Sequence, residues 1–284
     1  MKKSTHPLLQ LLVMLAMALG MLLISSIITT PMMLIDATSR PMILIAQSLT
    51  QLLTFLVPVV LMTVIYYRTS MREYLRLNFS GRHWYYALAG VVATLLIIPA
   101  NDWLTTWNDS WNLGRIGELL RRLQDATEGV VESMMSTDTV WGLLGNLLVV
   151  ALIPAVCEEV FFRAGIQNLL QKWVKNPHLA IWLTAIIFSL GHGEVFSFVP
   201  RFVLGALLGY LYVYGGSLLP NMMAHFVNNA ILVVLYWLMA RGVVDIDPEA
   251  PLQVDWALTA LCTLAAIAVL AATFYRKKDE TLKG

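Results

Sequence analysis

Polar side chains that could do chemistry lie at three places within otherwise apolar segments of the chain. They are Glu158, Glu159 and Arg163, then His192, then His225 and Asn229. Ionisable groups at membrane depth are costly, so each needs either a structural partner or a function. If the three places converge, they supply a general base, a second proton carrier and donors for an oxyanion. That combination predicts activation of a water molecule against a carbonyl group.

The same residue types could instead hold a metal ion. Two histidines and one glutamate are a ligand set found in catalytic zinc sites, which makes Glu158, His192 and His225 the candidate ligands. In this alternative a bound divalent metal such as zinc would activate the water. The residue types alone leave both versions open.

The two neighbouring glutamates are predicted to have different partners. Glu159 and Arg163 are four residues apart, so on a helix they share a face and can pair. Glu158 lies about 100° round the helix and points elsewhere, which leaves its carboxylate free for chemistry. The alternative is a cluster of charges at the inner end of a membrane span, with the charged groups reaching toward the interface.

The histidines also have a simpler explanation, in which each makes a hydrogen bond between helices. His225 and Asn229 are four residues apart and face one way, whereas His192 follows Phe188 in a different apolar segment. Residues on three separate helices can meet only in the interior of a bundle. The depths of these residues along their helices place the predicted site in the cytoplasmic half of the membrane.

The elements that must position these residues are membrane helices. The chain has 284 residues, of which 58% are apolar and only 13% are charged, about half of the ~25% that is usual for soluble domains. So few charges argue against a soluble enzyme or a disordered chain, because lipid has to solvate most of the outer surface. The net charge of +1 gives no electrostatic footprint for nucleic acid.

The chain is predicted to be an all-α, polytopic helix bundle that forms a single membrane domain over residues 1–284. Eight spans are expected, at about residues 8–28, 42–67, 84–101, 139–158, 178–196, 202–215, 218–240 and 256–275. With both termini cytoplasmic, thirteen of the 19 Lys and Arg side chains fall on the cytoplasmic side, as the positive-inside rule requires. This count includes Arg163 in a cytoplasmic stretch around 160–177.

One outer segment is predicted to be helical without spanning the membrane. Residues 113–135 place apolar side chains at roughly helical spacing among charges, which indicates an amphipathic helix lying on the interface. A lid over the site is the alternative function for this segment.

The motifs resemble those of the CPBP family of intramembrane proteases. The pattern consists of Glu158-Glu159-x-x-x-Arg163, Phe188-x-x-x-His192 and His225-x-x-x-Asn229, in that order and each on a hydrophobic segment. This family includes the type II CAAX prenyl endopeptidases and the bacterial Abi or bacteriocin-processing proteins. The motifs occupy residues 158–229, and the family's catalytic core would cover about 139–240.

The resemblance implies an endopeptidase that acts on a membrane-associated peptide or protein. It assigns activation of water to Glu158 and His192, and stabilisation of the oxyanion to His225 and Asn229. Glu159, Arg163 and Phe188 would have supporting roles. The favoured mechanism needs no cofactor, whereas the metalloprotease version would use zinc. The resemblance and the short loops also suggest a bacterial inner membrane.

Two other functions are compatible with the same residues. A non-proteolytic immunity or scaffold protein of the same fold would bind a peptide without cutting it. A proton-coupled transporter would use Glu158, Glu159 and His192 as a relay. Transport is the weaker alternative, because the first half of the chain has no counterpart of the polar residues in the second.

Overall fold

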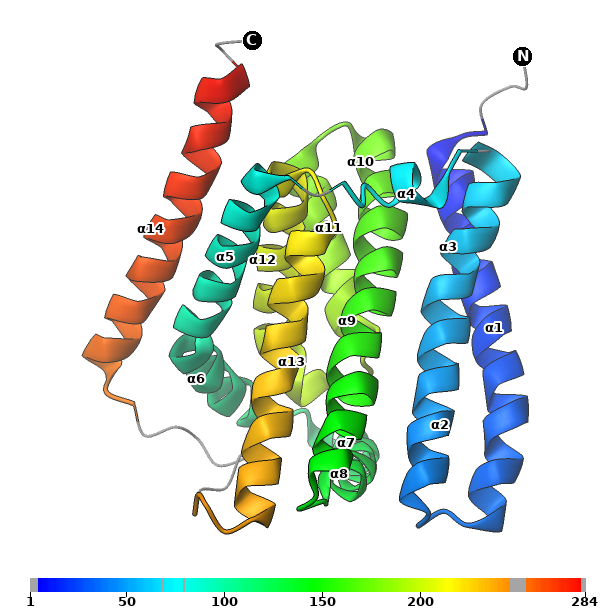
Figure 1. The fold of residues 1–284 in the computed structure, drawn as a ribbon. Coiled ribbons are helices and arrows are strands. Elements are labelled where there is room, and N and C mark those ends of the chain that lie inside the picture. The colour runs from blue at the N-terminus through cyan, green and yellow to red at the C-terminus, as the bar shows by residue number, and fades with distance from the viewer. Residues whose placement is uncertain (1–4, 68, 79, 246–253, 282–284) are drawn as a thin grey trace.

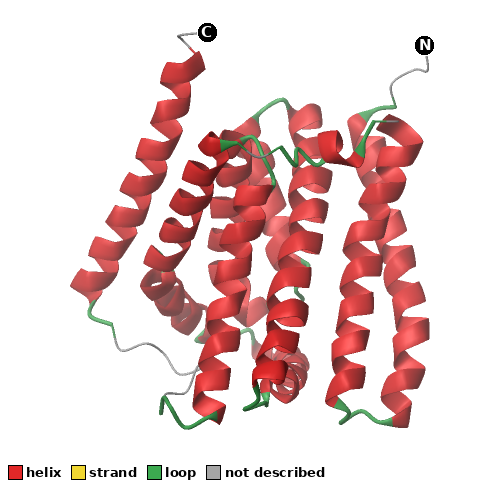
Figure 2. Ribbon diagram, viewed as in Figure 1, coloured by secondary structure: helices red, strands yellow, loops and turns green. Residues whose placement is uncertain are grey.

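The computed structural model describes residues 5–67, 69–78, 80–245 and 254–281, and these residues form helices and short connections without a strand (Figures 1 and 2). The predicted all-α bundle is therefore confirmed. The first half of the chain forms α1 (Pro7–Ile35), α2 (Arg40–Gln51), a π-helical segment (Leu52–Leu56), α3 (Val57–Met62), a second π-helical segment (Thr63–Tyr67), α4 (Met71–Tyr74), α5 (Gly81–Leu96), α6 (Ile98–Asp109) and α7 (Gly114–Met135).

The second half contains the elements that carry the three motifs. They are α8 (Val140–Asn146), a π-helical segment (Leu147–Leu152), α9 (Ile153–Glu158), a longer π-helical segment (Glu159–Gln167), α10 (Asn168–Val174), α11 (Pro177–Leu190), a 3₁₀ turn (Val195–Ser197), α12 (Phe198–Gly215), α13 (Leu219–Ala240) and α14 (Trp256–Thr281). Helix α1 begins, and α14 ends, at the same end of the bundle (Figure 1).

Six of the helical stretches in the described residues are long and apolar enough to cross a membrane. A seventh results if α5 and α6, which meet at a 47° bend, form one broken span. The eighth expected span corresponds to α11, which is apolar but has only 14 residues. These eight segments run in alternate directions through the bundle (Figure 1). The arrangement is that of a polytopic helical membrane protein, in which α11 is shorter than the expected span.

Prolines mark the places where the long helices change geometry. Pro58 and Pro154 lie near the starts of α3 and α9, and each follows a π-helical segment. Pro99 follows the junction at which α5 and α6 bend. Since proline lacks an N–H and crowds the preceding turn, a wider turn or a bend relieves the conflict.

The fourth helix continues past the predicted end of its span and through most of the stretch around 160–177. The cytoplasmic location of part of this stretch stays a prediction. One continuous helical stretch runs from Val140 to Val174, and it has 35 residues. Glu158 therefore lies in the middle of this helix rather than at its inner end. Arg163 is fully buried, so it does not belong to the loop charges. The prediction ended the span at the charged residues, but these residues neutralise one another inside the bundle.

The fifth span is shorter than predicted. The helix α11 ends at Leu190, so His192 lies in the turn that follows instead of inside a span. Gly193 adopts a φ of 73°, a left-handed conformation that glycine reaches without steric cost. This turn frees His192 from the regular helix and lets it approach the neighbouring elements.

The N-terminal hairpin packs beside the motif-bearing helix. Helix α1 lies against α2, α3 and α10, and a hydrogen bond of 2.7 Å joins the hydroxyls of Ser25 and Thr50 across the hairpin. The Phe55 ring contacts those of Phe161 and Phe162, with centroids 5.2 and 5.8 Å away. This aromatic contact fixes the hairpin next to the first motif.

The predicted amphipathic helix over 113–135 is confirmed as α7. It lies at the end of the bundle opposite to the beginning of α1 (Figure 1) and exposes Ile116, Leu119, Leu123 and Val130. Its last turn is tied to α2, because Arg40 Nε donates a hydrogen bond of 3.0 Å to the Met134 carbonyl. Its position at a membrane surface and its use as a lid stay predictions.

Candidate active site

Glu158 is the centre of a buried polar cluster. Its side chain lies at the junction between α9 and the π-helical segment Glu159–Gln167, and the residue is only 6% exposed. Oε1 accepts a hydrogen bond of 3.2 Å from Nε2 of Gln51. Oε2 lies 3.9 Å from Nε2 of His192 and 3.9 Å from Nε2 of His225. Segments far apart in the sequence thus converge on one carboxylate.

A hydrogen bond of the His192 ring determines which of its two nitrogens can accept a proton. Nδ1 lies 2.8 Å from the Phe188 carbonyl oxygen. Because a carbonyl only accepts, Nδ1 carries the hydrogen, and in the neutral ring Nε2 has the free lone pair. That lone pair faces the Glu158 carboxylate. His192 is also partly exposed, since 28% of its side chain is accessible.

Glu159 lies within contact distance of two of the other motif residues. Its Oε1 is 3.0 Å from His225 Nδ1, and its Oε2 is 3.2 Å from Nε of the fully buried Arg163. The predicted pair of Glu159 and Arg163 therefore forms. The pair also extends to His225, because the Glu159 carboxylate lies between the Arg163 guanidinium and the His225 ring. Glu159 therefore orients His225 in addition to pairing with Arg163. With Nδ1 directed at Glu159, the Nε2 atom of His225 is turned toward Glu158.

Phe188 forms an apolar wall shared by these groups. Its ring centroid lies 4.8 Å from that of His192 and 6.1 Å from that of His225. The Arg163 guanidinium lies over the same ring, 5.2 Å from the centroid. The ring shields the Glu159–Arg163 pair and restricts the orientation of both imidazoles. The spacing of Phe188 and His192, four residues apart, reflects this contact.

Asn229 lies one helical turn beyond His225 on α13. Its Nδ2 is 3.5 Å from the Val150 carbonyl oxygen, and its Oδ1 accepts a hydrogen bond from Asn228. It therefore flanks the cluster along the helix and contacts the segment before α9. Its predicted role at an oxyanion stays a prediction.

Two residues of the cluster were not predicted from the sequence. Asn221 is fully buried, donates to the Leu208 carbonyl and lies near the Glu159 carboxylate. It lies four residues before His225, just as Asn229 lies four residues after it. Extending this four-residue spacing toward the start of the helix would have predicted Asn221 on the same face. Gln51 had a weaker signal, an amide in an uncharged run. Nothing local indicates that its partner is 107 residues away.

The donor types of the cluster are those that zinc accepts, but their spacing is not that of a metal site. Among the described residues, no three His, Cys, Asp or Glu side chains form a group that could hold a metal ion. Hydrogen bonds and charge pairs within the chain account for the arrangement of the carboxylates and imidazoles. The fit of the cluster to a metal ion is therefore poor.

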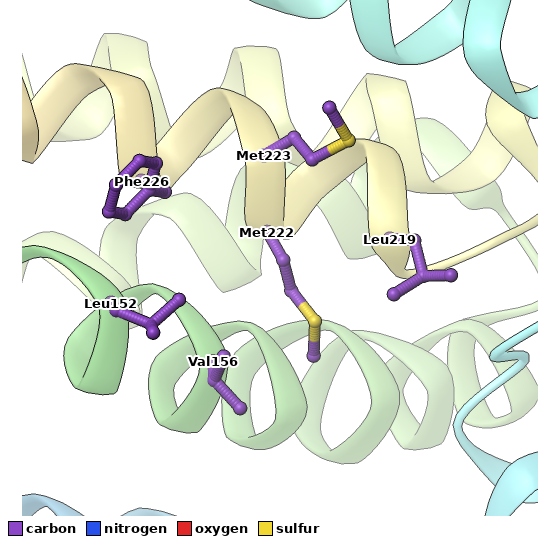
Figure 3. A pocket seen from close by; sticks show the side chains of 6 residues that line it. All are labelled: Leu152, Val156, Leu219, Met222, Met223 and Phe226. Carbon is purple, nitrogen blue, oxygen red and sulfur yellow. The ribbon is translucent and has the colours of Figure 1, made fainter. Parts of the chain in front are cut away.

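An apolar groove lies between α13 and the helical stretch formed by α9 and the π-helical segment before it (Figure 3). Its volume is about 380 Å³, and it is lined by Leu152, Val156, Leu219, Met222, Met223 and Phe226. Val156 and Met222 are close neighbours in sequence of Glu158 and His225 on the same two helices. The groove is therefore formed by the same two helical stretches that carry Glu158 and His225, and its lining is suited to apolar chains.

The fold defines a polytopic helical membrane protein, and the cluster gives it buried carboxylates next to imidazole rings. Residues 140–231 match the family described as type II CAAX prenyl endopeptidase Rce1-like. The family resemblance indicated by the three motifs is thereby confirmed over the segment from the start of α8 into α13. This segment contains every motif residue, whereas Gln51 lies outside it.

A relative of similar sequence is the uncharacterized protein YpbD of Bacillus subtilis (strain 168). The two are 28% identical over 90 residues, which cover 30% of this chain and 43% of YpbD. The chain thus matches less than half of the relative's length. No solved structure matches the chain. The matched family is one of proteases, and the apolar helices agree with an integral membrane protein.

Proposed function

We propose that the protein is an intramembrane endopeptidase that hydrolyses a peptide bond in a membrane-associated substrate. The observation that carries this proposal is the position of Glu158 Oε2, which lies 3.9 Å from Nε2 of both His192 and His225. These separations are too long for direct hydrogen bonds. They suit a water molecule held between the carboxylate and an imidazole, which is where a hydrolytic nucleophile is needed.

In the proposed reaction, Glu158 takes a proton from the water while His192 Nε2 accepts its second hydrogen bond. The water oxygen bonds to the substrate carbonyl carbon, and the carbonyl oxygen becomes the oxyanion. The C–N bond then breaks as the leaving amine receives the proton that Glu158 had taken. Glu158 returns to its carboxylate form, so one base serves both proton transfers.

His225 is proposed to stabilise the oxyanion. Its Nδ1 faces the Glu159 carboxylate at 3.0 Å, so an imidazolium at this position would have a compensating charge. In that form Nε2 carries a hydrogen and can donate toward the oxyanion. Asn229 is proposed as the second donor, on the basis of the family resemblance. Glu159, Arg163 and Phe188 hold His225 in the required orientation.

The proposed substrate is a peptide or protein at the membrane, of the CAAX type or of the bacteriocin-processing type. The apolar groove between the helices that carry Glu158 and His225 supports a substrate with an apolar part. The location proposed from the resemblance is a bacterial inner membrane. The favoured mechanism needs no cofactor, and a zinc-dependent version is its alternative. A non-proteolytic scaffold is the second candidate function, since the same groove could hold a peptide without cutting it.

The test is cleavage of a library of tagged membrane peptides by the purified protein. Glu158→Gln should lower the rate by about 10²–10⁴, the usual contribution of a general base. His192→Ala and His225→Ala should also lower it. Glu118→Gln, on the distant α7, is the control and should cleave like wild type. If all three site variants cleave normally, the assignment of the site is wrong.

Two further outcomes separate the alternatives. If wild type binds library peptides without ever cleaving them, the scaffold function is favoured instead. If cleavage is unchanged in a strong chelator, the zinc version is excluded. Activity that is lost in chelator and restored by added zinc would overturn the cofactor-free mechanism.

A further inference from the structure

Gln51 is a buried side chain from outside the family-matched segment that contacts the proposed base directly. It is the last residue of α2, and only 9% of it is exposed. Its Nε2 donates to Glu158 Oε1 over 3.2 Å, and this contact is buried. The matched segment begins at residue 140, so the N-terminal hairpin reaches into the site.

This hydrogen bond makes the two oxygens of Glu158 unequal. Oε1 is occupied by the Gln51 amide, whereas Oε2 has no hydrogen-bond partner among the described residues and faces the two histidines. An amide is a neutral donor that does not exchange a proton with a carboxylate. It therefore stabilises the charged form and its rotamer without taking over the role of acid or base.

The position of Gln51 is itself well fixed. Its neighbour Thr50 bonds Ser25 of α1 at 2.7 Å. At the other end of α2, Arg40 Nη2 donates to Asn146 Oδ1 at 2.7 Å, on the helical stretch that leads to Glu158. Thr50 thus ties α2 to α1, while the Arg40 link and the aromatic contact of Phe55, in the segment after α2, hold the hairpin against the motif-bearing helix. A donor on such a support can define the orientation of a carboxylate.

We propose that Gln51 is a positioning residue, which holds Glu158 with one oxygen bound and the other directed at the reacting water. This inference rests on the proposed function, because it assigns Glu158 as the base. It means that the N-terminal hairpin is part of the active site, although the three motifs lie elsewhere.

The experiment uses the full chain with Gln51→Met, which keeps the size of the side chain and removes the amide. We expect kcat to fall by about 10- to 100-fold, the range for loss of a hydrogen bond to a charged group, with KM little changed. Gln167→Met is the matched control, since Gln167 is fully buried and donates to the Gly209 carbonyl at 3.0 Å. It should lower thermal stability but leave the kcat of the folded protein unchanged.

A second measurement does not depend on cleavage. Dicyclohexylcarbodiimide reacts with protonated carboxyl groups inside membranes, and the modified residue is identified by mass spectrometry. Removing the donor from Oε1 disfavours the carboxylate, so Glu158 should be labelled several-fold faster in Gln51→Met than in wild type. Gln167→Met should label at the wild-type rate.

The outcomes distinguish this inference from the proposed function. If Glu158→Gln is inactive while Gln51→Met keeps the wild-type kcat and labelling rate, the positioning role is wrong and the endopeptidase stands. If wild type cleaves nothing, the proposed function fails, and the labelling rates still decide whether Gln51 controls Glu158. Equal labelling rates would overturn the inference in either case.

Discussion

At the scale of the residue, the two adjacent glutamates show how helix geometry separates chemical roles. Consecutive positions differ by about 100° around a helix, so Glu158 and Glu159 face different neighbours. Glu159 is paired with Arg163 and contacts His225. Glu158 instead accepts a hydrogen bond from the Gln51 amide through one oxygen, and its other oxygen lies 3.9 Å from a ring nitrogen of each histidine. The paired carboxylate supports the structure, and the other keeps an oxygen available for a proton.

The substitution Glu159→Gln should therefore destabilise the protein severely. It leaves the guanidinium of Arg163 buried without its counter-charge, which typically costs about 3–5 kcal/mol. The double variant Glu159→Gln/Arg163→Met should recover much of this loss, because no uncompensated charge remains. Thermal unfolding in detergent measures both effects.

The activity of the double variant separates stability from chemistry. We expect it to fold but to cleave poorly, since His225 Nδ1 no longer faces a carboxylate. Equal stability of Glu159→Gln and wild type would contradict the structural role assigned to the pair.

At the scale of the element, the turn that carries His192 depends on how α11 packs against α12. Two glycines spaced four residues apart on α12, Gly205 and Gly209, allow this close contact. A Cβ atom at Gly205 would meet Ala185 Cα at 3.3 Å and the Phe188 ring at 3.1 Å, whereas one at Gly209 would meet Ile181 Cγ2 at 2.8 Å. The packing thus positions Phe188 and, through it, His192.

Replacing Gly205 with leucine should push α11 away from α12. We expect lower thermal stability, by about 1–3 kcal/mol for overpacking, and a loss of cleavage that exceeds the loss of folded protein. Gly145→Leu is the control, because a Cβ atom there would meet nothing within 4 Å. Cleavage by Gly205→Leu at the wild-type rate would show that the contact does not position the site.

At the scale of the whole molecule, the candidate site is a meeting point of segments from both halves of the chain. The hairpin supplies Gln51, the long central helix supplies Glu158 and Glu159, and the turn after α11 and the helix α13 supply the histidines. Eight segments of alternating direction place the beginning of α1 and the end of α14 at one end of the bundle (Figure 1). The excess of basic residues predicts that this end is cytoplasmic.

Labelling of single cysteines can test this orientation. The native Cys157 and Cys262 are free and would first be replaced by alanine. Ala37→Cys, in the connection between α1 and α2, should react with a membrane-impermeant maleimide added to intact cells. Asn78→Cys, between α4 and α5 at the other end of the bundle, should react only after the membrane is opened. The reverse pattern would mean that the orientation is inverted.

The sequence by itself determined the class of fold and most of the candidate site. Apolar runs of about 20 residues predict membrane helices because lipid offers no partner to the backbone, and this requirement is local. The pairing of Glu159 with Arg163 followed from helical spacing, which is also local. Tertiary structure decided three other features: the continuation of the fourth helix to Val174, the end of α11 before His192, and the contact of Gln51 with Glu158. The burial of the Glu159–Arg163 pair and the partner of Gln51 both depend on distant helices. Phe188 of α11 covers the charged pair, and an amide finds its carboxylate only after the helices have packed.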